Sequence, residues 1–185
     1  MDALRFNVAG LLKDPAGATR DYDVEASPSE LAPVLEEAEP GGALSGHVQL
    51  MRTQRSIFVR GHLETEVVVE CSRCLAAATV PIAFDIQEEF FPQVDVLTGH
   101  AVPLPEEVEE AFTIDSTHEL DLTELVRQQL LLELPMQAVC RETCEGLCPR
   151  CGADLNQGPC ACPDEEVDER LAPLRALLER AAGGR

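Results

Sequence analysis

The chain has 185 residues, a length that fits one domain, or one domain with a small appended module. It carries 34 Asp and Glu against 14 Lys and Arg, and this net charge of -20 disfavours a protein that wraps a nucleic acid backbone, because such proteins cluster Lys and Arg. The 45% content of hydrophobic residues disfavours a fully disordered chain.

The first residues show no basic stretch followed by an apolar core, so no secretory signal is visible. The longest charge-free run near the middle of the chain, residues 74–84, contains Pro81 and is far shorter than the roughly 20 apolar residues of a membrane span. We therefore expect a cytoplasmic protein that does not contact a membrane. Structural disulfides are disfavoured in that reducing compartment.

The N-terminal part of the chain predicts strands and turns. Leu4, Phe6 and Val8 alternate with polar residues, which is typical of a half-buried strand. Residues 29–38 predict a short helix, and Pro40-Gly41-Gly42 then interrupts the chain.

The next part of the chain predicts an antiparallel meander. Alternation of apolar and polar residues, or a β-branched run, predicts four strands, at residues 44–50, 57–63, 67–69 and 80–86. Cys71 and Cys74 fall between the last two strands. We expect them at a hairpin tip, where their thiols can meet another part of the chain.

An acidic stretch follows the meander. Residues 85–126 contain twelve acids and no Lys or Arg. Its densest part forms either a solvated loop or a docking surface for a basic partner, and comprises Glu106, Glu107, Glu109 and Glu110.

Helices are predicted on either side of a cysteine-rich segment. Residues 121–124 (Asp-Leu-Thr-Glu) have the spacing of a capping box and predict a helix that ends at Pro135. Its expected buried face comprises Leu122, Leu125, Val126 and Leu130. A last amphipathic helix is predicted from near Leu171.

All eight cysteines fall in four close pairs, which are Cys71 and Cys74, Cys140 and Cys144, Cys148 and Cys151, and Cys160 and Cys162. Tetrahedral zinc favours such pairs, because one tight turn supplies two sulfurs at about 2.3 Å from the metal. Gly152, directly after Cys151, suits a turn whose backbone amides point back at the thiolates. The spacings therefore predict one or two zinc ions.

Two partitions of the cysteines remain open. We favour one site that joins the pair at 71 and 74 to the pair at 140 and 144, and a local site formed by the remaining four cysteines. The alternative is one zinc held by four of the six late cysteines, with the pair at 71 and 74 free. All-cysteine sites are typical of structural zinc. A redox-sensing role is the alternative, because exposed thiolates near positive charge are reactive.

Arg73, Arg141 and Arg150 lie inside or beside the cysteine pairs. They either offset the negative charge of the zinc-thiolate centres or form a small basic spot that contacts RNA phosphate, and we favour the first interpretation. Arg52, Arg55 and Arg60 would enlarge such a spot if the fold brought them near.

The run from Cys140 to Asn156, with its Gly146-Leu147-Cys148-Pro149-Arg150-Cys151-Gly152 centre, resembles the YceD family, as does the earlier Cys71-Ser72-Arg73-Cys74. The resemblance extends from about residue 44 onward. It implies a role in the accumulation of large-subunit (23S) ribosomal RNA, and so in ribosome assembly.

Taken together, the sequence predicts an α+β protein with an antiparallel or barrel-like sheet over residues 1–134 and a zinc-binding segment at 135–185, packed on that core. No phosphate-binding glycine loop and no hydrolase or metalloprotease motif is present, so we do not expect an enzyme. The expected function is a ribosome-assembly factor whose acidic surface holds a basic ribosomal or assembly protein. Direct RNA binding and a zinc-thiolate redox switch are the alternatives.

Overall fold

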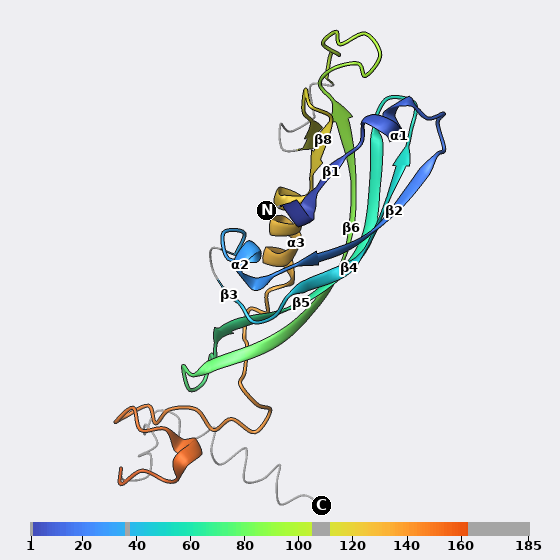
Figure 1. Cartoon of the computed structure of the whole chain (residues 1–185). Coiled ribbons are helices and arrows are strands. Elements are labelled where there is room, and N and C mark those ends of the chain that lie inside the picture. The colour runs from blue at the N-terminus through green and yellow to red at the C-terminus, as the bar shows by residue number, and fades with distance from the viewer. Residues whose placement is uncertain (1, 36–37, 105–111, 163–185) are drawn as a thin grey trace, which may run out of the picture. The chain divides into compact units, whose positions relative to one another are not determined.

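A computed structural model of the chain describes residues 2–35, 38–104 and 112–162 (Figure 1). The chain divides into two compact units, residues 1–144 and 145–185. The division after residue 134 and the packing of the zinc segment on the core stay predictions. The acidic residues at 106–110 and the last helix, expected from near residue 171, lie outside the described residues.

The described elements, in chain order, are η1 (Asp2–Leu4), β1 (Arg5–Asn7), α1 (Ala9–Lys13), β2 (Thr19–Ala26), α2 (Pro28–Leu31), β3 (Glu39–Pro40), β4 (Leu44–Arg52), β5 (Ile57–Glu70), β6 (Ala77–Pro92), β7 (Thr113–Ile114), β8 (Glu119–Asp121), α3 (Thr123–Glu133) and η3 (Leu155–Gln157). No helix among these described residues is long and apolar enough to cross a membrane.

The main sheet has the strand order β2-β4-β5-β6-β7, with β3 also paired to β5. Its pairs are antiparallel except for the short β6–β7 pair, which is parallel. The β5–β6 hairpin dominates the sheet, running from the Ile57–Phe90 pair to the Glu70–Ala77 pair (Figure 1). This arrangement confirms the α+β class and the mostly antiparallel sheet.

The predicted strands at 57–63 and 67–69 form one continuous strand, β5. Residues 64–66 carry no turn-forming Gly or Pro, and buried Thr65 keeps the period of two between buried Leu63 and Val67. The prediction of two separate strands was therefore wrong. One uninterrupted hairpin carries Cys71 and Cys74 to its tip.

Two N-terminal elements are shorter than predicted. The first strand covers only Arg5–Asn7, and the backbone N–H of Val8 donates to the carbonyl oxygen of His118 as the chain turns into α1. The helix expected at 29–38 covers only Pro28–Leu31 as an α-helix. Its start is a capping box, in which the Glu30 carboxylate accepts from the backbone N–H of Ser27 at 3.0 Å.

The hydrophobic core lies between one face of the sheet and the elements that cover it. In Figure 1, α2, α3 and the β1–β8 pair lie on this side of the long β5–β6 hairpin, and α3 packs against β6. The predicted apolar face of α3 is confirmed, because Leu122, Leu125, Val126 and Leu130 are all buried. Burial of each such side chain contributes about 1.5–3 kcal/mol.

The start of α3 differs from the predicted capping box. The N-cap residue is Leu122, and the Asp121 carboxylate accepts from the backbone N–H of Thr123 at 2.8 Å. Asp121 also pairs with Arg5 across the β1–β8 ladder, while Glu124 bonds Arg127 and Gln128 within the helix. These tertiary and helical partners take both carboxylates, so the reciprocal box does not form.

Candidate metal centre

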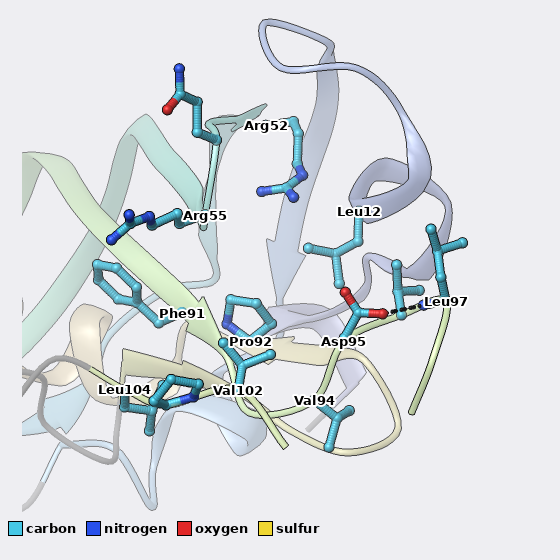
Figure 2. Close-up of a pocket in the computed structure, with 13 residues that line it drawn as sticks. Leu12, Arg52, Arg55, Phe91, Pro92, Val94, Asp95, Leu97, Val102 and Leu104 are labelled. Atoms are coloured by element: carbon cyan, nitrogen blue, oxygen red, sulfur yellow. Dashed lines mark hydrogen bonds between the residues drawn. The ribbon is translucent and has the colours of Figure 1, made fainter. Parts of the chain in front are cut away.

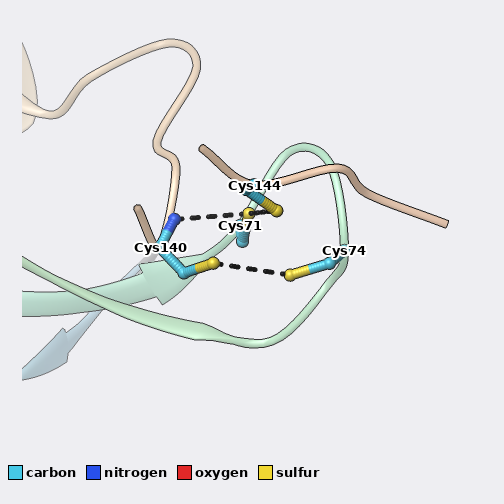
Figure 3. Close-up of side chains that lie close together, drawn as sticks. All are labelled: Cys71, Cys74, Cys140 and Cys144. Atoms are coloured by element: carbon cyan, nitrogen blue, oxygen red, sulfur yellow. Dashed lines mark hydrogen bonds between the residues drawn. The ribbon is translucent and has the colours of Figure 1, made fainter. Parts of the chain in front are cut away.

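Four cysteines from two distant parts of the chain meet at the tip of the β5–β6 hairpin (Figure 3). Cys71 and Cys74 stand in the turn, while Cys140 and Cys144 belong to the segment that follows α3. Their four sulfur atoms lie within 4.8 Å of one another. The Sγ–Sγ distance is 3.9 Å between Cys71 and Cys144, and 3.6 Å between Cys74 and Cys140.

These distances fit a tetrahedral metal. Four sulfurs each about 2.3 Å from a zinc ion lie about 3.8 Å apart. A disulfide would need about 2.05 Å, and all eight cysteines are free thiols. An all-thiolate donor set suits zinc among the common metals. The first group therefore has the donor chemistry and the spacing of a closed, structural zinc site.

Local backbone bonds shape the Cys71–Cys74 turn. The backbone N–H of Cys71 donates to the Ala76 carbonyl at 2.8 Å, and the N–H of Leu75 donates to the Cys71 carbonyl at 2.9 Å. Closing this turn places Leu75 at φ 62°, in the left-handed region that favours glycine.

Side chains of the turn hold the second cysteine pair in place. The Ser72 backbone N–H and hydroxyl both donate to the Ala138 carbonyl, at 2.8 and 2.9 Å. The Arg73 guanidinium donates to the Cys144 carbonyl at 2.8 Å. No sequence pattern indicates the role of Ser72, because its partner lies 66 residues away. These bonds anchor the chain on both sides of Cys140.

The electrostatics of the group formed by Cys71, Cys74, Cys140 and Cys144 favour a bound cation. Backbone N–H groups of Cys74, Cys140 and Arg73 surround the Cys71 sulfur and lower the pKa of its thiol to about 6. The neighbouring Cys74 thiol, together with burial, raises the pKa of Cys140 to about 12. One thiolate is thus stabilised while further thiolates repel each other, and a divalent metal ion would balance that charge.

The second unit contains the other four cysteines, Cys148, Cys151, Cys160 and Cys162, whose sulfurs also lie within 4.8 Å of one another. The Sγ–Sγ distance between Cys148 and Cys160 is 3.4 Å. Backbone N–H groups of Cys151 and Arg150 lower the pKa of Cys148 to about 6. Among the described residues, these two groups are the only clusters of His, Cys, Asp or Glu arranged to hold a metal.

The two CxxC turns repeat one hydrogen-bond pattern. The N–H of Cys148 donates to the Ala153 carbonyl at 2.8 Å, and that of Gly152 to the Cys148 carbonyl at 2.9 Å. Gly152 has φ 72° and occupies the place that Leu75 takes in the first turn. Aligning the two CxxC motifs in the sequence would have predicted the positive φ at Leu75.

We expect Leu75→Gly to stabilise the first unit by about 1 kcal/mol, because glycine relieves the left-handed strain and the Leu75 side chain is 57% exposed. Urea unfolding of the metal-loaded protein measures this. The matched variant Gly152→Leu places the strain in the second turn and is expected to weaken zinc retention there. An unchanged or lowered stability of Leu75→Gly would contradict the strain argument.

The sulfur groups have the same membership as the favoured partition of the sequence analysis. That these residues bind zinc stays a prediction.

Of the arginines beside the cysteine pairs, Arg73 donates to the carbonyls of Glu142 and Cys144, and Arg150 is exposed in the second unit. Arg141 is also exposed, beside Cys140.

The arginines of the central strands do not join this spot. Arg52 and Arg55 flank the start of β5, whereas Cys71 follows its end. A strand of 14 residues spans roughly 45 Å. Arg60 lies near the middle of the sheet, where it donates to Gln49 at 2.7 Å. The condition for an enlarged basic spot is therefore not met.

The fold and the site together define an α+β protein with a mostly antiparallel sheet and two four-cysteine clusters of metal-binding geometry. Residues 59–178 match the family described as "Large ribosomal RNA subunit accumulation protein YceD". The chain belongs to the YceD family, which confirms the resemblance seen in its cysteine motifs.

Similar proteins occur in bacteria and plants. The uncharacterized protein Rv2926c of Mycobacterium tuberculosis is 30% identical over 95% of this chain and 81% of its own length. The chloroplastic "Large ribosomal RNA subunit accumulation protein YCED homolog 1" of Arabidopsis thaliana is 26% identical over 72% of this chain and 48% of its own. The uncharacterized protein YlbN of Bacillus subtilis is 32% identical over 62% of each chain. No solved structure matches the chain significantly.

Proposed function

We propose that this protein is a non-enzymatic, cytoplasmic factor of ribosome assembly that supports the accumulation of large-subunit (23S) ribosomal RNA. The match of residues 59–178 to the YceD family carries the proposal. The name of the Arabidopsis relative, which states the same role, supports it. The test is a strain that lacks the protein: we expect a lower ratio of 23S to 16S RNA, restored by the wild-type gene.

Within this function, the two cysteine groups would each hold a structural zinc ion. The sulfur spacings and the closed, all-cysteine donor sets support this role. Each zinc would join two cysteine pairs that lie in different parts of the chain. A redox role is the alternative, and release of zinc by mild peroxide from the intact protein would favour it.

The protein would dock a basic ribosomal or assembly protein through acidic surface. Besides the acidic residues at 106–110, the outer face of the main sheet supports this proposal. Ser45 pairs with Glu25 on one side and Glu64 on the other, and Glu66 follows on the same face of β5. These three glutamates are exposed. Complementary charge speeds and orients such docking more than it tightens it.

We expect the triple variant Glu25→Gln/Glu64→Gln/Glu66→Gln to lose a large part of its basic protein partners in a pull-down at low salt, because it removes three negative charges from one face without changing side-chain size. High salt should produce the same loss with the wild-type protein, through screening of exposed charges. Mass spectrometry and RNA sequencing of the captured material measure both classes of partner.

The matched control is Glu119→Gln/Glu133→Gln/Glu142→Gln, which removes three exposed charges from β8, the end of α3 and the cysteine segment. Its partners should be nearly unchanged. Equal losses with both triples would show a net-charge effect and reject this face as the docking surface. Capture of RNA without basic proteins would favour direct RNA binding as the main contact.

A further inference from the structure

A cavity of about 530 Å³ lies at the end of the main sheet opposite the cysteine turn (Figure 2). Three parts of the first unit line it: α1, the β4–β5 hairpin and the loop that follows β6. Its volume is in the range of pockets that hold small organic ligands, about 300–1,000 Å³. Neither the cysteine groups nor the acidic outer face uses this cavity.

One side of the cavity is apolar. Phe91 and Pro92 at the end of β6 lie beside Val102 and Leu104 from the following loop, and Leu12 of α1 closes another side (Figure 2). The Phe91 side chain is half-buried, and its ring is the aromatic surface of the lining. This wall suits a flat, apolar body larger than one aliphatic side chain.

The other side carries positive charge. In Figure 2 the arginines of the β4–β5 hairpin, Arg52 and Arg55, stand over Phe91 and Pro92. One guanidinium nitrogen of Arg52 donates to the Ser56 carbonyl at 3.0 Å, and its other N–H groups remain available to a ligand. The Arg55 guanidinium is exposed and has no partner among the residues that the structure describes. In a chain of charge -20, an exposed guanidinium at a cavity mouth, without a partner in the described part of the chain, favours a negatively charged ligand.

Asp95, the acidic residue that lines the cavity, accepts hydrogen bonds from residues of its own turn. Its Oδ1 accepts from the backbone N–H groups of Leu97 and Thr98, at 3.0 and 2.7 Å, and from the Thr98 hydroxyl at 2.9 Å. These bonds hold the carboxylate in the loop. No ion pair joins Asp95 to Arg55 among the residues that the structure describes.

We infer that this cavity binds one unpaired nucleotide of single-stranded RNA, with the base against Phe91 and the phosphate on Arg52 and Arg55. Guanidinium groups bind phosphate through paired N–H donors. Unstacked bases bind on aromatic rings. Gln54, which also lines the cavity, offers an amide that can both donate to and accept from a base edge.

An acidic peptide is the competing ligand, because arginine also binds carboxylates. The observations favour the nucleotide. Two guanidinium groups match a phosphate better than a single carboxylate, and the cavity is larger than an anchoring side chain needs. The cavity also offers the Arg55 guanidinium, which has no partner among the described residues, whereas Arg73 beside the cysteine turn donates to two backbone carbonyls.

Binding of a labelled single-stranded RNA of about ten nucleotides to the zinc-loaded full chain tests the inference, with fluorescence anisotropy at several salt concentrations. We expect Arg55→Gln to weaken binding about tenfold. The negative slope of log affinity against log salt should also become shallower by about 0.7, the contribution of one phosphate contact. Phe91→Leu should weaken binding about tenfold without changing the slope. Melting curves check that both variants fold.

The matched control is Arg60→Gln, which removes an exposed arginine that does not line the cavity. It should bind RNA nearly as the wild type does. Equal weakening by Arg60→Gln and Arg55→Gln would overturn the inference, as would absence of RNA binding. Tighter binding of a peptide rich in Glu and Leu than of RNA would assign the cavity to a protein ligand instead. Free AMP, UMP, CMP and GMP as competitors distinguish a mononucleotide ligand from an RNA strand.

This inference rests on the proposed role in ribosomal RNA accumulation, and a strain that lacks the protein separates the two. If the deletion leaves 23S RNA unchanged, the proposed function fails. If the deletion lowers 23S RNA and Arg55→Gln restores it as fully as the wild type, the function stands and the cavity is not its RNA contact. We expect Arg55→Gln to restore it only in part.

Discussion

Replacing Cys140 by serine should lower the zinc content from about two to about one ion per chain, because a structural site needs all four thiolates. It should also release the segment around Ala138 from the hairpin tip, where Ser72 now holds it. We expect the first unit to lose about 3 kcal/mol of unfolding free energy, or about 10 °C in melting temperature. Metal analysis and calorimetry of the same sample measure both effects.

The matched control is Cys160→Ser, which removes a ligand from the second group. It should lower the zinc content equally, yet leave the melting of residues 1–144 unchanged, because the second group closes within residues 148–162. The double variant should hold no zinc. Wild-type protein without zinc, or Cys140→Ser protein that keeps both ions, would reject the two-site assignment.

Gly46→Ala should destabilise the first unit by about 3 kcal/mol, through a backbone clash between two central strands. Gly46 on β4 stands opposite Leu63 on β5. A Cβ atom there would overlap the carbonyl oxygen of His62 and lie 2.9 Å from the Cα of Leu63. Neither neighbour can rotate away, because both are main-chain atoms of a paired strand. Urea unfolding measures the loss.

Gly17→Ala separates the clash from backbone strain. Gly46 has φ 155°, and Gly17 also has a positive φ, 93°, but a Cβ atom at Gly17 would meet nothing within 4 Å. This variant should cost only about 1 kcal/mol. Similar losses for the two variants would show that the left-handed conformation, rather than the approach of β4 to β5, explains the need for glycine at 46.

The meander could be predicted largely from local pattern. Alternation at Leu44, Val48 and Leu50 places those side chains on one face of a strand, and one buried face then selects the register. The same local logic located Cys71 and Cys74 at a hairpin tip. The local pattern was not sufficient at residues 64–66, where it fits either a break between two strands or one continuous strand. Only the pairing with β6 shows that the strand continues.

The cysteine pairs show the same division between local and tertiary information. The spacing within each pair is local, so the sequence by itself indicated zinc-type ligands. Which pair meets which depends on the path of α3, which brings Cys140 back to a turn that lies 66 residues earlier in the chain. Spacing left that partition open, and the tertiary structure decided the grouping of the sulfurs.

The distribution of charge shows the same division between what the sequence determines and what the tertiary structure decides. The sequence alone determined that the chain is strongly acidic and that its arginines are few. Sequence distance could not say that Arg52 and Arg55 stand at one end of β5 while Arg73 stands beyond the other. Side-chain chemistry and short-range periodicity depend only on neighbouring residues, so they can be determined from the sequence. The cavity under Arg55, like the sulfur groups, comes from segments far apart in the chain, and only their packing brings them together.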